Sequence, residues 1–208
     1  MENTNLLEIL LELGAIHLSN TTPFEWASGW LSPIYCDNRL ALSSYEAREI
    51  ICAEMQKVLA RKYSDIGSIV AVATGALPMG AIVAQAERLP FAYVRPKAKD
   101  HGLENQVEGR VTQGERVVVI EDLVSTGGSS LKAVDALRNI GAEVLGMVSI
   151  FTYAFPQAER AMRDANVDFE ALATYPQLLS LLKSKGKLSA EEEARLSEWR
   201  EHPETWGR

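Results

Sequence analysis

The stretch Val117 to Ser130, VVVIEDLVSTGGSS, places two carboxylates directly before a turn rich in hydroxyls and glycine. Aliphatic residues run into Glu121 and Asp122, a pattern typical of a buried strand in a parallel sheet. The turn leads into a helix-forming segment, so the backbone N–H groups of 125–129 would converge near a helix N-terminus. This arrangement suits a phosphate monoester.

Carboxylates beside a bound phosphate repel it unless a polar group lies between them. A ribose 5-phosphate provides such a group, because its vicinal hydroxyls can donate to Glu121 and Asp122 while its phosphate binds the turn. The residues that bind this sugar phosphate would be Glu121, Asp122, Leu123, Val124, Ser125, Thr126, Gly127, Gly128 and Ser129, with the phosphate itself on 125–129. A Mg²⁺ ion bridging sugar hydroxyls and a pyrophosphate would neutralise the remaining charge.

Other readings of this stretch fit less well. A Walker A loop needs a Lys after its glycines, where this chain has Ser129 and Ser130, and a GxGxxG fingerprint is absent. The alternative without a ligand is an ordinary turn after a buried strand, with two solvated acids.

A row of cations lies in the segment Tyr93 to Gly109, YVRPKAKDHGLENQVEG. Arg95, Lys97, Lys99 and His101 occupy every second position, so an extended chain would project all four from one side. The alternative is a solvated surface loop. Beside a sugar-phosphate site, a cationic lid that closes on pyrophosphate is favoured.

The elements that position these groups follow from hydrophobic periodicity. Strands are predicted at 68–73, 91–94, 116–120, 144–151 and 167–173, and helices at 78–87, 127–140 and 156–165. This alternation indicates a parallel sheet covered by helices on both faces, with ligands at the carboxyl ends of the strands.

The flanking segments are predicted as follows. A helix over 6–13 precedes short strands and turns over 16–35, and a capping box at Ser43 and Glu46 begins a helix that reaches about Tyr63. Residues 95–109 form a loop. Two helices follow the last strand, one over 175–185 and one capped by Ser189.

The composition limits the class of protein. The 208 residues are 47% hydrophobic and 24% charged, which is typical of a soluble globular domain, and the net charge of −7 disfavours nucleic-acid or membrane partners. Cys36 and Cys52 lack CxxC spacing, which fits a reducing, cytoplasmic compartment. The uncharged stretch Ile66 to Ala86 could span a membrane by length, but Gly and Pro interrupt it and favour strand, loop and helix.

The segment Val118 to Ser129 resembles the motif of type I phosphoribosyltransferases that binds PRPP (5-phosphoribosyl 1-diphosphate). The cationic segment narrows the resemblance. RxKxKxHG followed by NQxEG is similar to the flexible loop of orotate phosphoribosyltransferases, which reaches the active site of the neighbouring subunit in a dimer. The matching positions are Arg95, Lys99 and His101; Pro96 stands where one variant has Lys, so the role of Lys97 stays open.

Two further segments carry this resemblance. Ser28 to Arg39, SGWLSPIYCDNR, is similar to the family's SGxxSPxYxDxR segment near the base site. The implied orotate-binding residues are Ser28, Gly29, Tyr35 and Ser125, with Tyr35 able to stack on a flat ring.

Ala73 to Ala81 resembles the family's pyrophosphate loop. Ala27 and Gly75 stand where some members have Lys, so pyrophosphate would rely more on backbone amides and the lid.

The resemblance implies a type I phosphoribosyltransferase-like α/β fold, with a mainly parallel central sheet flanked by helices. A single domain over 1–208 would include a hood segment (1–40) and a C-terminal helical extension (174–208). The implied reaction transfers the ribose 5-phosphate of PRPP to orotate, giving orotidine 5'-monophosphate (OMP) and pyrophosphate in UMP biosynthesis.

The resemblance also implies catalytic residues and an assembly. Arg95, Lys99 and His101 would stabilise the leaving pyrophosphate in a cytoplasmic homodimer with shared active sites. Mg²⁺ would be the cofactor, held mainly through PRPP and close to Asp122.

Three alternatives remain. A phosphoribosyltransferase for another base, such as a purine, would keep the sugar site. A regulator that senses PRPP without catalysis would usually add a basic nucleic-acid surface. A non-catalytic interaction module would rest on the C-terminal helices alone.

Overall fold

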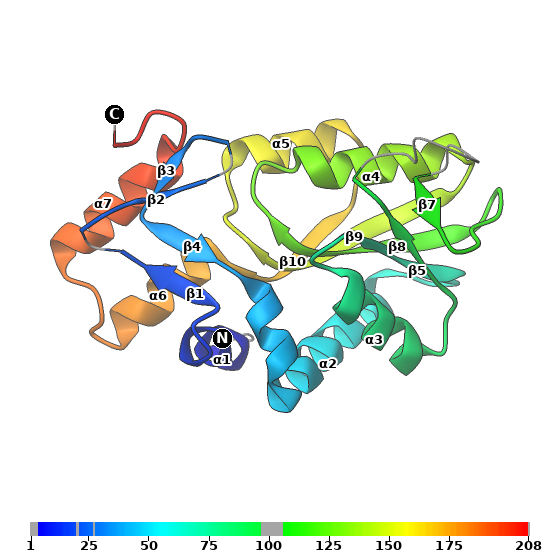
Figure 1. Cartoon of the computed structure of the whole chain (residues 1–208), viewed down its shortest axis with the longest axis horizontal. Coiled ribbons are helices and arrows are strands. Elements are labelled where there is room, and N and C mark those ends of the chain that lie inside the picture. The colour runs from blue at the N-terminus through cyan, green and yellow to red at the C-terminus, as the bar shows by residue number, and fades with distance from the viewer. Residues whose placement is uncertain (1–3, 20, 27, 97–105, 208) are drawn as a thin grey trace.

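The computed structural model describes residues 4–19, 21–26, 28–96 and 106–207. Within these ranges a six-stranded sheet has the order β10-β9-β8-β5-β6-β7 (Figure 1). Its strands are β5 (Ser68–Val72), β6 (Phe91–Val94), β7 (Val107–Glu108), β8 (Arg116–Val124), β9 (Glu143–Thr152) and β10 (Phe169–Thr174). Every neighbouring pair is parallel except β6 with β7, which confirms the mainly parallel sheet.

Helices cover both faces of this sheet. Helices α2 (Tyr45–Lys62) and α3 (Leu77–Glu87) lie on one face, and α4 (Gly128–Asn139) and α5 (Pro156–Asp164) lie on the other (Figure 1). The aliphatic run Val117 to Ile120 of β8 is completely buried, as expected for a strand covered from both sides.

The direction of chain progression reverses at the centre of the sheet. From β5 the chain crosses through α3 to β6, whereas from β8 it crosses through α4 to β9 and through α5 to β10. The carboxyl ends of β5 and β8 therefore form a topological switch point, where open α/β sheets bind their ligands.

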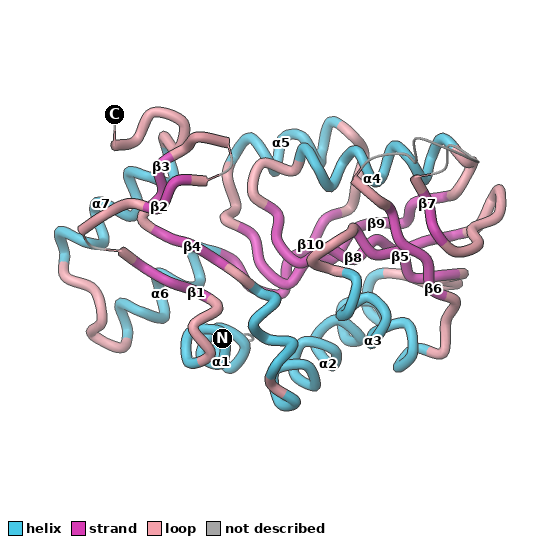
Figure 2. Tube along the Cα trace, viewed as in Figure 1, coloured by secondary structure: helices cyan, strands magenta, loops and turns pink. Residues whose placement is uncertain are grey.

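The N-terminal elements and the last two helices pack together at one end of the molecule (Figure 2). After α1 (Thr4–Glu12), β1 (Ile16–Leu18) pairs with β4 (Ile34–Cys36) and β2 (Phe24–Glu25) pairs with β3 (Leu31–Ser32). A 3₁₀ helix, η1 (Asn38–Ser43), leads into α2, and α6 (Tyr175–Ser184) and α7 (Ala190–Glu201) lie beside the small strands.

A cluster of aromatic rings joins these parts. Trp199 of α7 is completely buried, and its ring lies 5.7 Å from that of Trp26 and 5.5 Å from that of Tyr153. Its indole N–H donates to the carbonyl of Leu31 in β3 at 3.1 Å. The C-terminal helices thus pack on the N-terminal segment of the same chain.

Three local predictions were wrong. Helix α2 is capped by Ser44, because Ser43 closes η1 and donates its hydroxyl to the Leu40 carbonyl. Segment 95–109 contains β7, which gains its backbone hydrogen bonds by pairing with β6. Strand β8 continues past Ile120 to Val124 because β9 runs beside it to Thr152.

The predicted division of the uncharged stretch 66–86 is confirmed, since it forms β5, a loop and α3. Among the described helices, none combines the length and apolar character that crossing a membrane requires.

Candidate active site

Glu121 and Asp122 lie near the carboxyl end of β8 in different surroundings, because successive side chains of a strand point to opposite faces. Glu121 is only 4% exposed, and its Oε2 accepts a hydrogen bond from the Ser130 hydroxyl at 2.8 Å. Its Oε1 accepts from the Asp122 N–H at 3.1 Å. Asp122 is half-buried, and its Oδ1 accepts from the Leu123 N–H at 2.9 Å. Asp122 is therefore the more accessible of the two carboxylates.

Burial raises the pKa of the Glu121 carboxyl well above its ordinary value, and the neighbouring Asp122 carboxyl adds to this rise. The hydrogen bonds from Ser130 and from the Asp122 N–H oppose the rise, but burial outweighs them. Glu121 thus holds a proton to higher pH than an exposed carboxyl does.

Gly75, in the loop after β5, leaves room for the Asp122 carboxylate. A Cβ atom on Gly75 would lie 2.0 Å from Oδ2 of Asp122 and 2.4 Å from its Cγ. Any larger residue here, including the Lys of some family members, requires Asp122 to move. The missing side chain of Gly75 therefore leaves the space that the Asp122 carboxylate occupies at the carboxyl ends of β5 and β8.

The turn after β8 is open to a ligand. Gly127 has φ +83°, a conformation that favours glycine, and it packs close to Met162 of α5. Gly128 and Ser129 are exposed, Ser125 and Thr126 are partly exposed, and nothing lies within 4 Å of a Cβ built on Gly128. The backbone of this turn is therefore accessible from outside the protein at Gly128 and Ser129.

The helices that begin at the switch point have no side-chain cap. Helix α4 begins after Gly127 and α3 after Ala76, and neither cap residue accepts a hydrogen bond through its side chain. Helix α5 also lacks one, whereas Ser44, Thr174 and Ser189 cap α2, α6 and α7. The first N–H groups of α4 are thus available to an anion, whereas in α3 the Leu77 N–H already donates to the Thr74 carbonyl and Pro78 has no N–H.

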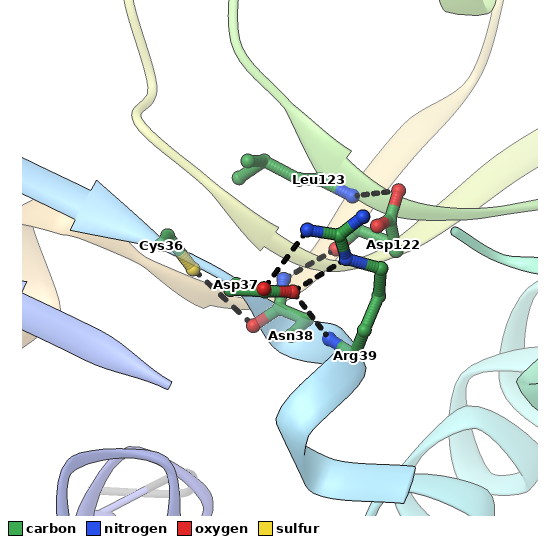
Figure 3. Close-up of polar contacts among 6 residues, drawn as sticks. All are labelled: Cys36, Asp37, Asn38, Arg39, Asp122 and Leu123. Atoms are coloured by element: carbon green, nitrogen blue, oxygen red, sulfur yellow. Dashed lines mark hydrogen bonds and ion pairs between the residues drawn. The ribbon is translucent and has the colours of Figure 1, made fainter. Parts of the chain in front are cut away.

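The segment after β4 contacts Asp122 directly (Figure 3). Asn38 donates its side-chain N–H to the Asp122 carbonyl at 2.7 Å and accepts from the Cys36 thiol at 3.3 Å. Asp37 and Arg39 form a two-pronged ion pair beside it. The sequence motif 28–39 includes these residues, but no role was predicted for Asn38 or Arg39. Their polar side chains, close in sequence to Tyr35, could have indicated one.

Three of the four residues predicted to bind the base lie in the N-terminal strands and their turn, and the fourth, Ser125, directly follows β8. Tyr35 of β4 is 40% exposed, and its ring lies 5.7 Å from that of Phe24. Ser28 and Gly29 form the turn between β2 and β3, where the Gly29 N–H donates to the Trp26 carbonyl at 2.8 Å.

Trp26 connects this turn to the end of β9. Its ring lies 4.8 Å from that of Tyr153, whose N–H donates to the Val124 carbonyl at 3.3 Å. The structure therefore joins the β2–β3 turn, through two aromatic residues, to the strand residue that immediately precedes Ser125.

Arg95 lies at the carboxyl end of β6 on the other side of the switch point. Its N–H donates to the Gln106 carbonyl at 2.8 Å, and its Nη1 lies 3.6 Å from Oε1 of Glu108. Arg95 lines a cavity of about 290 Å³ together with Ser129 and Lys132. Sequence reasoning missed Lys132, although its place one turn after Ser129 on the predicted helix could have revealed it. Lys97, Lys99, His101 and Ala27 lie outside the described residues.

The described residues build no cage for a metal ion, since they contain no group of three or more His, Cys, Asp or Glu side chains suited to one. Mg²⁺ in phosphoryl-substrate sites usually has one or two protein carboxylates and takes its other ligands from phosphates and water. Asp122, alone and partly accessible, fits an ion that arrives with its substrate.

Comparisons with known proteins agree with this geometry. The family model described as phosphoribosyl transferase domain matches residues 41–171. The chain is 51% identical over 198 residues to the orotate phosphoribosyltransferase of Porphyromonas gingivalis, a match that covers 95% of this chain and 94% of that protein.

Two solved structures are also similar. The orotate phosphoribosyltransferase of Aeropyrum pernix matches with a TM-score of 0.75 and 30% identity, over 88% of this chain and 99% of that one. The UMP synthase of Leishmania donovani matches with a TM-score of 0.78 and 28% identity, over 96% of this chain and 43% of that longer one. The protein described here belongs to the orotate phosphoribosyltransferase family of phosphoribosyl transferases.

Proposed function

We propose that the protein transfers the ribose 5-phosphate group of PRPP to orotate, releasing pyrophosphate and forming OMP for UMP biosynthesis. The observation that carries this proposal is the placement of Asp122 at the switch point, directly before the open turn and the uncapped N-terminus of α4. The family membership supports the choice of orotate over a purine.

In this proposal the ribose diol of PRPP faces Asp122 and its 5-phosphate binds 125–129. Glu121 supports the site without contacting the ribose, because both of its carboxyl oxygens already accept hydrogen bonds within the protein. It keeps the Asp122 backbone in place and reaches the diol only if its contact with Ser130 opens. Neither acid is assigned as a general base; the proton that the reacting ring nitrogen of orotate loses as the new C–N bond forms passes to water or to the departing pyrophosphate.

The larger demand falls on the leaving pyrophosphate, which carries several negative charges as the bond to the anomeric carbon breaks. We assign its stabilisation to Arg95, Lys99 and His101, helped by backbone amides of the loop after β5. Mg²⁺, carried in by PRPP beside Asp122, supplies further charge neutralisation when it is bound. Closure of the segment between β6 and β7 as a lid excludes the water that would otherwise attack the oxocarbenium-like centre.

The base site in this proposal lies between Tyr35 and Ser125, with Ser28 and Gly29 contacting the ring edge. Tyr35 is suited to stacking because its ring remains 40% exposed. Orotate bound here would have its reacting nitrogen directed toward the ribose at Asp122.

We further propose a homodimer with shared active sites, working in the reducing cytoplasm. Besides Tyr35, which we assign to the base, the exposed large hydrophobic side chains of the described residues are Leu40 in η1 and Tyr45 at the start of α2. Exposed apolar side chains near the site support a surface that a partner covers. Cys36 and Cys52 are free and buried thiols, which supports the compartment.

The decisive experiment is a spectrophotometric assay of orotate consumption with PRPP and Mg²⁺. We expect turnover with orotate, none with uracil, xanthine or adenine, and loss of turnover in excess EDTA that added Mg²⁺ restores. Asp122→Asn is the matched inactive variant. Consumption of a purine in place of orotate would favour the alternative phosphoribosyltransferase, and binding of PRPP without any turnover would favour the regulator.

A further inference from the structure

The guanidinium of Arg39 has one of its two hydrogen-bonding edges already occupied. Its Nε donates to Oδ1 of Asp37 at 2.6 Å and its Nη2 donates to Oδ2 at 2.8 Å. A guanidinium has a second edge, formed by Nη1 and the other Nη2 hydrogen, that can hold another carboxylate in the same way. Toward the residues that the structure describes, Nη1 of Arg39 donates no hydrogen bond.

This free edge lies where the base site and the ribose site meet. Arg39 directly follows Asn38, whose side chain donates to the Asp122 carbonyl at 2.7 Å, and its guanidinium extends toward Asp122 (Figure 3). Asp37 is the main cause of the raised pKa of Arg39, and Tyr35 and Asp122 add smaller electrostatic contributions. Both the residue proposed to stack on the base and the one proposed to hold the ribose are thus near this cation.

No other Lys, Arg or His occurs in the sequence from 21 to 45. The loop after β5 (73–76) and residues 149–156 at the end of β9 contain none either. The cations Arg95 and Lys132 line the cavity beside Ser129, on the phosphate side. Arg39 is therefore the cation that these parts of the chain offer to the base.

The chemistry of orotate requires a cation at this place. Its carboxylate is attached to the ring carbon next to the nitrogen that bonds to the anomeric carbon of ribose. In the bound substrate and in OMP, the carboxylate must then lie beside the sugar, close to the acid that holds the diol. A cation between two carboxylates removes the repulsion that would otherwise oppose binding.

We propose that Arg39 is the specificity-determining residue that recognises the 6-carboxylate of orotate and OMP, with Asp37 holding its guanidinium in orientation. This inference rests on the proposed function, because it assumes that the pyrimidine occupies the region between Tyr35 and Ser125. It explains how the same pocket can reject uracil, which fits sterically but leaves the guanidinium edge without a partner.

The test compares OMP with UMP, which differ only in this carboxylate, by isothermal titration calorimetry. Wild-type protein should bind OMP more tightly than UMP. Arg39→Gln should weaken OMP binding about 10- to 100-fold, as expected for losing charge-assisted hydrogen bonds. UMP binding should stay within about twofold of wild type. Arg39→Lys, which keeps the charge but not the fork, should fall between the two.

Arg61→Gln is the matched control. Arg61 has the same 60% side-chain exposure as Arg39 and pairs with Glu170, at the far end of α2. It should change neither affinity. If Arg39→Gln weakens the binding of OMP and of UMP equally, or leaves OMP binding unchanged, the assignment of Arg39 is wrong. Orotate turnover by the wild-type protein would still support the proposed function in that case. A wild-type protein that shows no preference for OMP and no orotate turnover would refute the function and the assignment together.

Discussion

The orientation of the Asp122 carboxylate depends on the missing side chain of Gly75, whose Cβ would lie 2.0 Å from Oδ2. We predict that Gly75→Ala displaces Asp122 and weakens PRPP binding about 10-fold or more, since a hydrogen bond to a charged group contributes about 1.5–3 kcal/mol. Equilibrium binding of PRPP with Mg²⁺ measures this loss. The fold should remain intact because the three atoms nearest to the added methyl group all belong to the Asp122 side chain.

Gly128→Ala provides the comparison for that variant. A Cβ on Gly128 meets no atom within 4 Å in the protein alone, so the unliganded structure should not change. If the 5-phosphate binds 125–129, the added methyl hinders the ligand itself, and affinity for inorganic phosphate falls together with affinity for PRPP. Gly75→Ala should leave inorganic phosphate binding unaffected. Identical profiles for the two variants would contradict the division between the ribose and phosphate parts of the site.

The buried Glu121 carboxyl should make stability depend on pH. Its pKa is raised in the folded protein, so the folded state binds this proton more tightly than the unfolded state does. Its contribution to the free energy of unfolding is full below the unfolded pKa and is lost as pH rises through the folded pKa. Glu121→Gln replaces the carboxyl with an amide that does not titrate, so the free energy of unfolding of the variant does not fall in this way as pH rises.

The variant should therefore gain stability relative to wild type as pH rises from about 4.3, the ordinary pKa of a glutamate carboxyl, toward the raised folded pKa. Urea unfolding of both proteins without PRPP, across this range, measures the difference and cancels the titration of other groups. Parallel stability curves would show that Glu121 titrates normally.

At the scale of elements, α7 contacts β3, beside the proposed base site, through the indole of Trp199. Trp199 is completely buried and donates to the Leu31 carbonyl in β3, which lies between the Ser28–Gly29 turn and Tyr35. Trp199→Ala should cost about 3–5 kcal/mol of unfolding free energy because a large cavity remains. Trp199→Phe keeps most of the packing and should cost only about 1 kcal/mol for the lost hydrogen bond.

The Phe variant separates stability from site geometry. It should raise KM for orotate more than KM for PRPP, because the hydrogen bond it removes supports the base side of the site. Steady-state kinetics with each substrate varied in turn provide the measurement. An equal rise in both KM values would mean that α7 stabilises the fold without positioning the base site.

Elements with strong local signals were the ones that the sequence predicted. The aliphatic strands, the Ser189 cap of α7 and the Gly127 turn depend on neighbouring residues, and each formed as expected. Strand β7 has two residues, too few for any periodicity, and exists because β6 pairs with it. The contact of Asn38 with Asp122 joins residues 84 positions apart and depends on the tertiary fold. Gly75 was visible in the sequence only as a departure from the family pattern.

At the scale of the whole molecule, the proposed homodimer can be tested by asking which subunit's proposed lid serves which active site. The lid leaves the sheet after β6 and returns at β7, where the Arg95 N–H bonds to the Gln106 carbonyl. If it acts across a dimer, a site combines Asp122 of one subunit with Lys99 of the other. Lys99→Ala and Asp122→Asn should each be inactive as homodimers, the first losing about 100-fold or more in turnover.

Co-expression of these two variants with different affinity tags distinguishes the two arrangements. In a mixed dimer with exchanged lids, one site has both an intact Asp122 and an intact Lys99, and the other site has neither. Random pairing then restores about a quarter of wild-type activity, and purified mixed dimers about half. If each lid serves its own subunit, every site in the mixed dimer keeps one defect, and activity stays at the level of the separate variants. Because one arrangement restores about half of wild-type activity to the mixed dimer and the other restores none, a partly purified mixed dimer is enough to decide between them.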